Sequence, residues 1–425
     1  MVKIVILNLT HFENKGSMGR IEGMLNCLEK TLQHINVKIL HRYYNKDKDT
    51  SVKNLLVKYP YLEIKDHPWF KETSINFLTV LLSLIRFFFL IVWRKSLSKL
   101  GLLKDEINQC DIIIDLNHIE PDKFTRNFSI TGLIGGFLTL LNTWFAIMSG
   151  KPVFVCSATI GPYHNIILRR FATYVLQKVD IITLREKDSQ DYLQLLGVNK
   201  PLIYLSADLA FLLEAINNKD AMAILSNKGF NLTDRHVIGI APTEMMHPFL
   251  PYGNYVKLIA EISDYLIEKF KATILYIVHT YQDLPVSESI YQKVKNKDKI
   301  RIISNLSASE IKGIIGICDL FIGSRFHALV GSTSLGIPSL SLVAYSQRKF
   351  NGIIGDLMGQ KNYLLEICDE FEYNTFFNEL KLKVDDLWMK RELVTKKLNE
   401  RNSLAKDLVL LNGRLIKELI NTSQN

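Results

Sequence analysis

Short β-branched runs that alternate with helical patterns constrain the fold of this chain more than any other feature. The strand-like runs are residues 3–9, 37–40, 111–116, 152–161 and 181–185 in the first half, and residues 236–243, 272–279, 300–304, 319–323 and 338–343 in the second. Between them, apolar residues recur with helical spacing, as in residues 18–32, 169–178, 187–196 and 255–269. This alternation is typical of parallel, doubly wound sheets. We therefore predict an α/β fold.

Length and one polar segment indicate two such domains. With 425 residues the chain exceeds one ordinary domain, and residues 214–235 are polar and of mixed charge. We expect a Rossmann-like domain over residues 1–220 and a second over residues 235–425, which ends in helices rich in Lys and Glu. Folds of this kind bind ligands at the carboxyl edge of their strands and between domains. We therefore expect the ligand site in a cleft between the two.

Charge and cysteine content limit the classes of partner and the cellular compartment that we expect. A net charge of +9 suits anionic partners, but the basic residues stand mostly in mixed stretches such as NKDKD and KNKDK, without the interleaved aromatic residues of nucleic-acid recognition. The five cysteines are scattered singly, which favours a reducing compartment and no structural zinc. The first residues, MVKIVILNLTHFEN, do not follow the pattern of a signal peptide. We expect a cytoplasmic protein with no nucleic-acid partner, metal or cofactor.

One apolar segment allows a contact with a membrane. Residues 76–93, NFLTVLLSLIRFFFLIVW, are apolar apart from Arg86, and two basic residues follow. About 18 residues is the lower limit for crossing a bilayer, and Arg86 disfavours a span because a charge at mid-bilayer costs several kcal/mol. A buried helix is the first interpretation, a helix on the membrane surface the second, and a span the least favoured. Any contact with the inner face of the cell membrane is expected through residues 76–95.

The stretch CDLFIGSRFHALVGSTSLGIPSLSLV, residues 318–343, carries the clearest functional signal. Its pattern predicts a strand, a serine suited to capping a helix (Ser324), a helix that begins at Arg325, and a second strand. Gly336 suits the left-handed position just after that helix. Arg325 is then expected near the first helical position and His327 near the third, at the carboxyl edge of a parallel sheet.

Two basic side chains at a helix N-terminus oppose the helix dipole unless an anion is present. A cation at this position costs up to about 1 kcal/mol. With a phosphate or carboxylate bound, a cation at this position becomes favourable, because free N–H groups, a guanidinium and an imidazole all bind the anion. The dipole also tends to keep His327 neutral until an anion arrives, which suits a proton-transfer residue. The spacing fits equally well a buried structural His327 beside a surface Arg325.

The same stretch resembles the signature of the polysaccharide pyruvyl transferases. In that family an apolar strand precedes Arg-Leu-His-Ala, a small-residue helix, Gly-(Val/Ile)-Pro, another strand and Tyr-x-x-Lys. The corresponding residues here are Arg325, Phe326, His327, Ala328, Gly336, Ile337, Pro338, Tyr345 and, shifted by one position, Lys349. Other stretches are similar in the same order, namely Asn14-Lys15-Gly16-Ser17, SATIGPY (157–163), TLREKDSQDYLQLLG (183–197) and ADLAFLL (207–213). DLNHIEPDKF departs from the family, which often has a Gly-Gly-Gly turn there.

The resemblance implies a glycosyltransferase-B-like fold. It also implies transfer of pyruvate from phosphoenolpyruvate to a sugar of a surface polysaccharide or of its lipid-linked precursor, forming a cyclic ketal. In that chemistry Arg325 is expected to be a bidentate anion clamp, and His327 a proton donor or a phosphate ligand. The donor-binding set is then Arg185, Ser324, Arg325, His327, Tyr345 and Lys349, with Arg185 closing on the donor from the first domain.

Gly16, Ser17 and Gly161 are expected to shape acceptor-side loops of the first domain. Structural roles also fit, with Gly161 as a strand stop and Arg185 as a surface partner of Glu186 or a nearby aspartate. Two other functions stay open at this point. One is a glycosyltransferase with a nucleotide-sugar donor, whose second domain would also offer a helix N-terminus to a diphosphate. The other is a basic, membrane-associated assembly factor.

Overall fold

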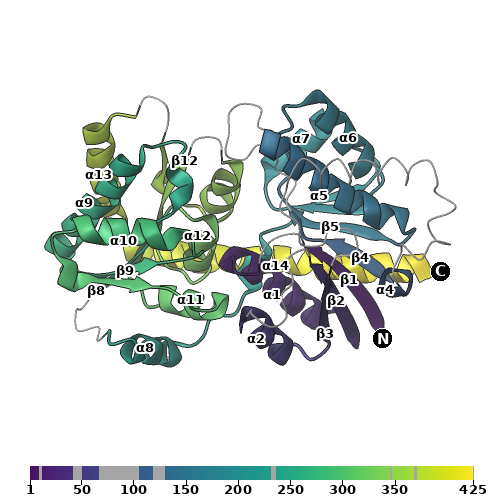
Figure 1. Ribbon diagram of the computed structural model, residues 1–425, viewed down its shortest axis with the longest axis horizontal. Coiled ribbons are helices and arrows are strands. Elements are labelled where there is room, and N and C mark those ends of the chain that lie inside the picture. Colours follow the sequence, from purple (N-terminus) through teal and green to yellow (C-terminus); the bar gives the residue numbers. More distant parts are fainter. Residues whose placement is uncertain are drawn as a thin grey trace. The chain divides into compact units, whose positions relative to one another are not determined.

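The computed structural model describes residues 1–8, 12–41, 50–66, 105–117, 130–230, 236–344, 347–367 and 371–424 (Figure 1). The chain divides into two compact units. Unit 1 comprises Met1–Phe12, Leu25–Ala207 and Leu408–Asn425, and unit 2 comprises Glu13–Met24 and Asp208–Asp407.

Unit 1 is built on a seven-stranded parallel sheet in the order β3-β2-β1-β4-β5-β6-β7. Its strands are β1 (Val2–Asn8), β2 (Ile35–His41), β3 (Leu62–Asp66), β4 (Ile112–Asp115), β5 (Val153–Ala158), β6 (Ile181–Leu184) and β7 (Leu202–Leu205). Ile4 of β1 lies beside Val37 of β2 on one side and Ile112 of β4 on the other. The strand order therefore reverses direction between β1 and β4, as in doubly wound folds.

Helices pack on this sheet through apolar side chains. The helices of this part of the chain are α1 (Lys15–Thr31), α2 (Thr50–Lys58), α4 (Asp105–Asn108), α5 (Ile130–Met148), α6 (Ile166–Leu176) and α7 (Lys187–Leu195). Val155 and Ile182 of the strands share one buried cluster with Trp144 of α5 and Val175 of α6. Every residue of β5, VFVCSA, is buried, since a parallel strand is covered on both faces.

Unit 2 repeats the arrangement with a six-stranded parallel sheet in the order β10-β9-β8-β11-β12-β13. Its strands are β8 (His236–Ala241), β9 (Ala272–Ile277), β10 (Ile300–Ile303), β11 (Leu320–Gly323), β12 (Ser339–Ala344) and β13 (Leu364–Ile367). The order reverses between β8 and β11, so the carboxyl ends of β8, β9 and β11 form the edge at which such a sheet binds ligands.

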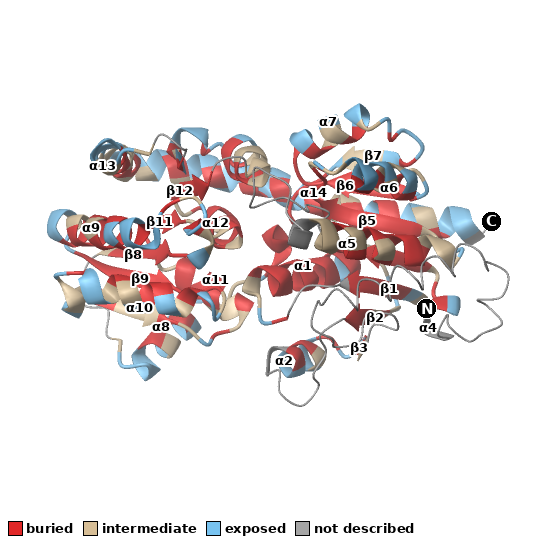
Figure 2. Cartoon of the chain, turned by 45° about the horizontal axis from the view of Figure 1, so that its top comes forward, coloured by how far each residue is buried: buried red, intermediate tan, exposed pale blue. Residues whose placement is uncertain are grey.

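The helical elements of unit 2 connect these strands. They are η1 (Leu209–Leu212), α8 (Asn218–Asn227), η2 (Glu244–Met246), α9 (Tyr252–Phe270), α10 (Asp283–Lys293), η3 (Lys297–Lys299), α11 (Ala308–Ile315), α12 (Phe326–Thr333), η4 (Phe350–Leu357), η5 (Lys361–Tyr363), α13 (Tyr373–Met389) and α14 (Arg391–Gln424). Helix α11 begins with a capping box, because Glu310 N donates to Ser307 Oγ and Ser307 N donates to Glu310 Oε2. Figure 2 shows buried strands in both sheets, with exposed residues on the outer faces of the helices.

The units exchange segments through α1 and α14, each of which contributes to both. The first turns of α1 pack in unit 2, where Gly19 faces Leu213. Its last turns pack in unit 1, where Cys27 Sγ donates to the carbonyl oxygen of Val409 at 3.4 Å. The continuous ranges expected from the sequence, 1–220 and 235–425, assign residues 13–24 to the first domain and residues 408–425 to the second, whereas these segments belong to unit 2 and unit 1.

The predicted α/β class with two Rossmann-like units is confirmed. Residues 76–93 lie outside the described residues, so the expected apolar helix there stays a prediction. Among the helices of the described ranges, none is long and apolar enough to cross a membrane.

Candidate functional site

The segment around Arg325 joins β11 to α12 at the carboxyl edge of the unit 2 sheet. Arg325 has an extended backbone and is the N-cap of α12, and His327 is the second residue of the helix. The prediction placed both residues later in the helix and made Ser324 the cap, which is wrong by one residue. Ser324 instead accepts a hydrogen bond from the buried hydroxyl of Tyr255 at 3.1 Å. Gly336, after the helix, has the predicted left-handed backbone, with φ +77°.

The guanidinium of Arg325 is engaged by a carboxylate of the same unit. Its Nε donates to Asp283 Oδ2 at 2.7 Å and its Nη2 donates to Asp283 Oδ1 at 2.5 Å. Nη2 also donates to Thr280 Oγ1 at 3.0 Å. The side chain of Asp283 is fully buried and that of Arg325 is 12% exposed. The bidentate edge that was expected to clamp an anion is therefore already paired inside unit 2.

Asp283 ties together the loops that follow three strands. Besides Arg325 after β11, it accepts from the backbone N–H of Glu244 after β8 at 3.3 Å. It also accepts from the backbone N–H of Thr280 after β9 at 3.2 Å, and from the hydroxyl of Thr280 at 3.1 Å. Buried charges persist when they are paired and hydrogen-bonded. We conclude that the Arg325–Asp283 pair fixes the shape of the sheet edge.

His327 lies between a carboxylate and a helix backbone. Its Nε2 is 3.7 Å from Oδ2 of Asp208, whose side chain is fully buried. Asp208 also accepts from the backbone N–H of Ala210 at 2.9 Å and caps η1. The ring of His327 lies so close to Gly16 of α1 that a Cβ added to Gly16 would be 2.5 Å from Cγ. The structure therefore brings Gly16, expected on the acceptor side, against the predicted catalytic histidine of unit 2.

Gly16 and Ser17 occupy the first turn of α1. The side chain of Asn14 caps this helix, because its Oδ1 accepts from the backbone N–H groups of Gly16 at 3.0 Å and Ser17 at 3.3 Å. Ser17 is buried. The Asn-x-Gly-Ser pattern thus forms a capped helix start in unit 2, and it belongs to the same unit as Arg325 and His327.

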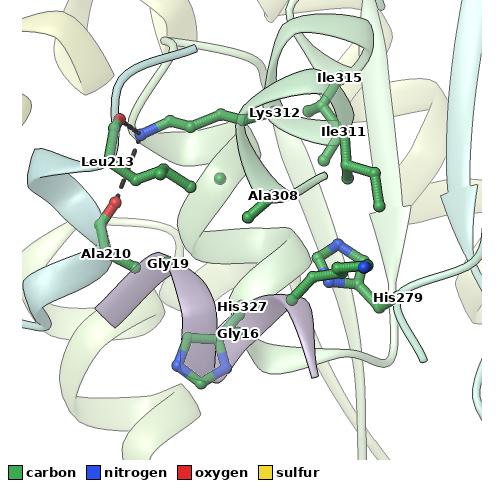
Figure 3. A pocket seen from close by; sticks show the side chains of 12 residues that line it. Gly16, Gly19, Ala210, Leu213, His279, Ala308, Ile311, Lys312, Ile315 and His327 are labelled. Atoms are coloured by element: carbon green, nitrogen blue, oxygen red, sulfur yellow. Dashed lines mark hydrogen bonds between the residues drawn. The ribbon is translucent and has the colours of Figure 1, made fainter. Parts of the chain in front are cut away.

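A small pocket of unit 2 joins these elements. It is lined by Lys15, Gly16 and Gly19 of α1, Ala210 and Leu213 at η1, His279, Ala308, Ile311, Lys312 and Ile315 of α11, and His327 and Gly331 of α12 (Figure 3). Three basic side chains besides His327 line it, and the sequence analysis assigned a role to none of them. His279 directly follows β9, so the rule that polar residues at the carboxyl ends of parallel strands bind ligands would have identified it.

His279 is a buried basic group of this pocket. It is 7% exposed, and its Nε2 has no hydrogen-bond partner among the described residues. Burial, together with the positive charges of Arg325, His327 and Lys15, lowers the pKa of His279 to about 3. The imidazole is therefore neutral at pH 7 and lies in a positive potential.

Lys312 faces away from the two histidines. Its Nζ donates to the carbonyl oxygens of Leu213 at 2.7 Å and Ala210 at 3.4 Å (Figure 3). Burial and the nearby charge of Lys406 lower the pKa of Lys312 to about 7. Only its aliphatic stem is thus available to the pocket, while its amine holds the end of η1.

Two further donor-side predictions lie after β12. Lys349 is the residue before η4, and its Nζ lies 5.6 Å from the centre of the Phe326 ring, a cation–π arrangement. Phe326 precedes His327, so Lys349 lies near the histidine in the fold. Tyr345 falls outside the described residues, and its role stays a prediction.

The remaining predicted residues, Arg185 and Gly161, lie in unit 1. Arg185 is 2% exposed, and its Nε donates to Thr159 Oγ1 at 2.6 Å. It also forms an ion pair with the buried Glu186 at 3.5 Å. Arg185 is therefore paired with Glu186 as one interpretation proposed, but in the interior of unit 1 and not on its surface.

Gly161 packs against an aromatic ring from α7. It has a left-handed backbone with φ +72°, and a Cβ there would overlap the ring of Tyr192. The hydroxyl of Tyr192 accepts from the backbone N–H of Tyr163 at 2.8 Å, and Ser189 Oγ accepts from the backbone N–H of Ile160 at 2.9 Å. The two motifs SATIGPY and TLREKDSQDYLQLLG thus pack against each other, and this packing gives a structural reason for both motifs.

Two parallel sheets of the doubly wound type, one in each unit, define a two-domain α/β protein. Within the described ranges, no group of three His, Cys, Asp or Glu side chains is placed to hold a metal ion.

Comparison with known proteins gives the family. The polysaccharide pyruvyl transferase family matches residues 23–347, and the chain belongs to this family. It is 22% identical over 213 residues to the amylovoran biosynthesis protein AmsJ of Erwinia amylovora, a match that covers 46% of this chain and 50% of AmsJ. The chain thus spans about half the length of that relative. Both findings support a role in polysaccharide biosynthesis.

Solved structures confirm the glycosyltransferase-B-like fold. Anabaena Alr3699/HepE, solved with UDP and glucose, gives a TM-score of 0.57 at 11% identity, with 99% of this chain and 100% of that chain covered. UDP-GlcNAc 2-epimerase from Methanocaldococcus jannaschii gives 0.58 at 14% identity, covering 91% and 93%. UGT71G1 from Medicago truncatula, complexed with UDP-glucose, gives 0.59 at 13% identity, covering 99% and 98%.

Proposed function

We propose that the protein transfers pyruvate from phosphoenolpyruvate to a sugar of a surface polysaccharide or of its lipid-linked precursor, forming a pyruvate ketal. The observation that carries this proposal is the cationic pocket of unit 2, which is built in part by the Arg-x-His segment of the family match. Phosphoenolpyruvate carries a carboxylate and a phosphate, and both suit a pocket lined by Lys15, His279 and His327.

The chemistry requires one proton transfer before carbon–oxygen bonds form. The methylene carbon C3 of phosphoenolpyruvate takes a proton, which leaves an oxocarbenium-like centre at C2. One sugar hydroxyl adds to C2 and loses its proton. Phosphate then leaves with the electrons of its bond to C2, and a second hydroxyl adds and loses its proton. The products are the ketal and inorganic phosphate.

We assign the residues of unit 2 to this sequence as follows. His327 donates the proton to C3 or binds the phosphate, and its Nε2 lies 3.7 Å from the buried carboxylate of Asp208. Arg325 positions the sheet edge through Asp283 and adds positive charge at short range. Gly16 leaves the space in which the His327 ring lies.

The test is release of inorganic phosphate from phosphoenolpyruvate in the presence of candidate sugar acceptors, including lipid-linked ones. We expect phosphate release that depends on the acceptor and is lost in His327→Gln. The control is His247→Gln, because His247 is an exposed histidine of the same unit. If no acceptor gives phosphate release while a nucleotide-sugar is consumed, the glycosyltransferase alternative replaces this proposal. Liposome flotation of the protein tests the membrane contact predicted for residues 76–95.

A further inference from the structure

A buried ring nitrogen without a partner among the described residues lies beside the Arg-x-His segment. His279 follows β9, is 7% exposed and lines the unit 2 pocket (Figure 3). No hydrogen bond reaches its Nε2 from the described residues. Leaving a buried polar atom unpaired typically costs about 1–3 kcal/mol. Such an atom at the edge of a binding sheet therefore points to a ligand that completes it.

The residues around His279 determine what kind of ligand can pair with its Nε2. Lys15 and His327 line the same pocket, and Arg325 lies close enough to add its positive charge at His279. The first turn of α1, a helix of 17 residues, also borders the pocket at Lys15 and Gly16. A helix N-terminus and several cations together favour negative charge. These surroundings therefore favour an anionic oxygen as the partner of Nε2.

The size of the pocket limits what enters it. The free space between the lining side chains is about 20 Å³, which is enough for a water-sized group and not for a sugar ring. One oxygen of a carboxylate or a phosphate fits this space, with the rest of the molecule outside it. A neutral imidazole, which donates from one nitrogen only, suits a single oxygen of this kind.

We propose that His279 Nε2 donates a hydrogen bond to an oxygen of a small carboxylate- or phosphate-bearing ligand, and that His279, Lys15 and His327 together form an anion subsite of unit 2. Since the fork of Arg325 is occupied by Asp283, this subsite supplies the direct contacts that the sequence analysis assigned to Arg325. The identification of the ligand as phosphoenolpyruvate rests on the proposed function, whereas the anion subsite itself does not.

Calorimetric titration of the full chain with two probes tests the subsite. Sulfate stands for the tetrahedral phosphate and pyruvate for the carboxylate. We expect at least one of them to bind, and His279→Leu to weaken that binding at least tenfold. Whichever probe binds identifies the group that His279 holds. The same change at the exposed His247 is the matched control and should leave binding unchanged. Failure of both probes to bind the wild-type chain overturns the proposal.

The stability of the unliganded variants separates a ligand residue from a structural one. Because Nε2 has no partner among the described residues of unit 2, His279→Leu should leave the melting temperature unchanged or raise it. A large fall in melting temperature would instead show a structural role and overturn the proposal. His279→Gln, which keeps an N–H donor, should retain more affinity than His279→Leu.

A measurement on the wild-type chain covers the case in which the variants do not fold. With ¹⁵N-labelled histidine, the ring resonances of His279 should move when sulfate or pyruvate saturates the protein, and resonances that stay in place would refute the assignment. The subsite and the proposed function can fail separately. Anion binding through His279 without phosphate release from phosphoenolpyruvate would leave the subsite standing and remove the pyruvyl transfer.

Discussion

Replacing Gly16 by alanine tests the link between α1 and His327 most directly. A Cβ at this position would lie 2.5 Å from Cγ and 2.8 Å from Cε1 of His327, and closer still to Nδ1. An ordinary carbon–carbon contact is about 3.5 Å, so the ring must retreat by about 1 Å. The neighbouring atoms belong to a side chain and not to backbone, so the ring is able to rotate away while the helix stays in place.

The expected change in folding stability is small. Alanine in a helix is favoured over glycine by about 0.8–1 kcal/mol. Against this, an off-rotamer His327 costs about 0.5–1.5 kcal/mol, and loss of the partly exposed pair with Asp208 costs up to about 1 kcal/mol. We therefore expect the free energy of unfolding to change by less than about 2 kcal/mol.

The expected change in activity is large. A displacement of about 1 Å in a catalytic group lowers rates by roughly 100-fold, so Gly16→Ala should lose about two orders of magnitude in phosphate release from phosphoenolpyruvate. The ¹⁵N resonances of the His327 ring should also shift, and this readout does not depend on the identity of the substrate. Urea denaturation gives the free energy of unfolding in the same samples.

Two other glycines of the same helix provide the controls. A Cβ at Gly19 would meet Leu213 Cδ2 at 3.3 Å and Ala210 Cβ at 3.6 Å and not His327, so Gly19→Ala should leave the ring resonances of His327 in place. A Cβ at Gly23 would lie 2.6 Å from the backbone carbonyl carbon of Leu209, which cannot rotate away, so Gly23→Ala should unfold more easily by about 2 kcal/mol or more. Full activity in a folded Gly16→Ala protein, with unmoved His327 resonances, would refute the reasoning.

Three further changes test the buried charges. Asp283→Asn leaves the guanidinium of Arg325 without its ion pair and should lower the free energy of unfolding by about 3–5 kcal/mol in urea; a loss below about 1 kcal/mol would contradict the pairing. Arg185→Met removes the cation of the buried Arg185–Glu186 ion pair inside unit 1, so we expect a similar loss of stability, with the apparent affinity for the donor unchanged in the protein that remains folded; a selective loss of donor affinity at native stability would support its predicted binding role. Lys312, with its pKa lowered to about 7, binds fewer protons when folded than when unfolded, so the free energy of unfolding should rise between pH 7 and pH 10 by up to about 1.4 kcal/mol per pH unit. Urea denaturation at several pH values should show a flatter profile in Lys312→Met, and parallel profiles would contradict the lowered pKa.

The interior strands of both sheets could be predicted from the sequence, whereas three of the four edge strands could not. The interior strands, such as β5 and β8, are continuous apolar runs because both faces are covered. The missed strands β3, β7 and β13 all lie at sheet edges. β7, for example, has two exposed and two half-buried residues although its sequence, LIYL, is apolar, so its apolar residues did not mark it as a strand. β10, the fourth edge strand, was predicted from its β-branched run IRII.

At the candidate site, the sequence predicted the basic residues but not their partners. The sequence indicated Arg325 and His327 through their place after a strand, and that place is confirmed to within one residue. Their partners could not be read in the same way, since Asp283 and Asp208 are carboxylates that follow other elements. Local spacing therefore predicted the basic side chains. Whether Arg325 clamps an anion or positions the sheet edge depends on its contact with Asp283, which only the tertiary structure shows.

The position of Gly16 shows why motif order alone does not give the unit to which a motif belongs. A motif near the N-terminus was attributed to the first domain because domains were taken as continuous ranges. The helix that carries this motif begins in unit 2 and ends in unit 1. Since the ring of His327 fits only against a residue without Cβ at position 16, the N-terminal Asn-x-Gly-Ser motif and the Arg-x-His motif form one structural unit. A family member with alanine at position 16 would therefore need a different orientation of the histidine, and the two motifs should be interpreted together.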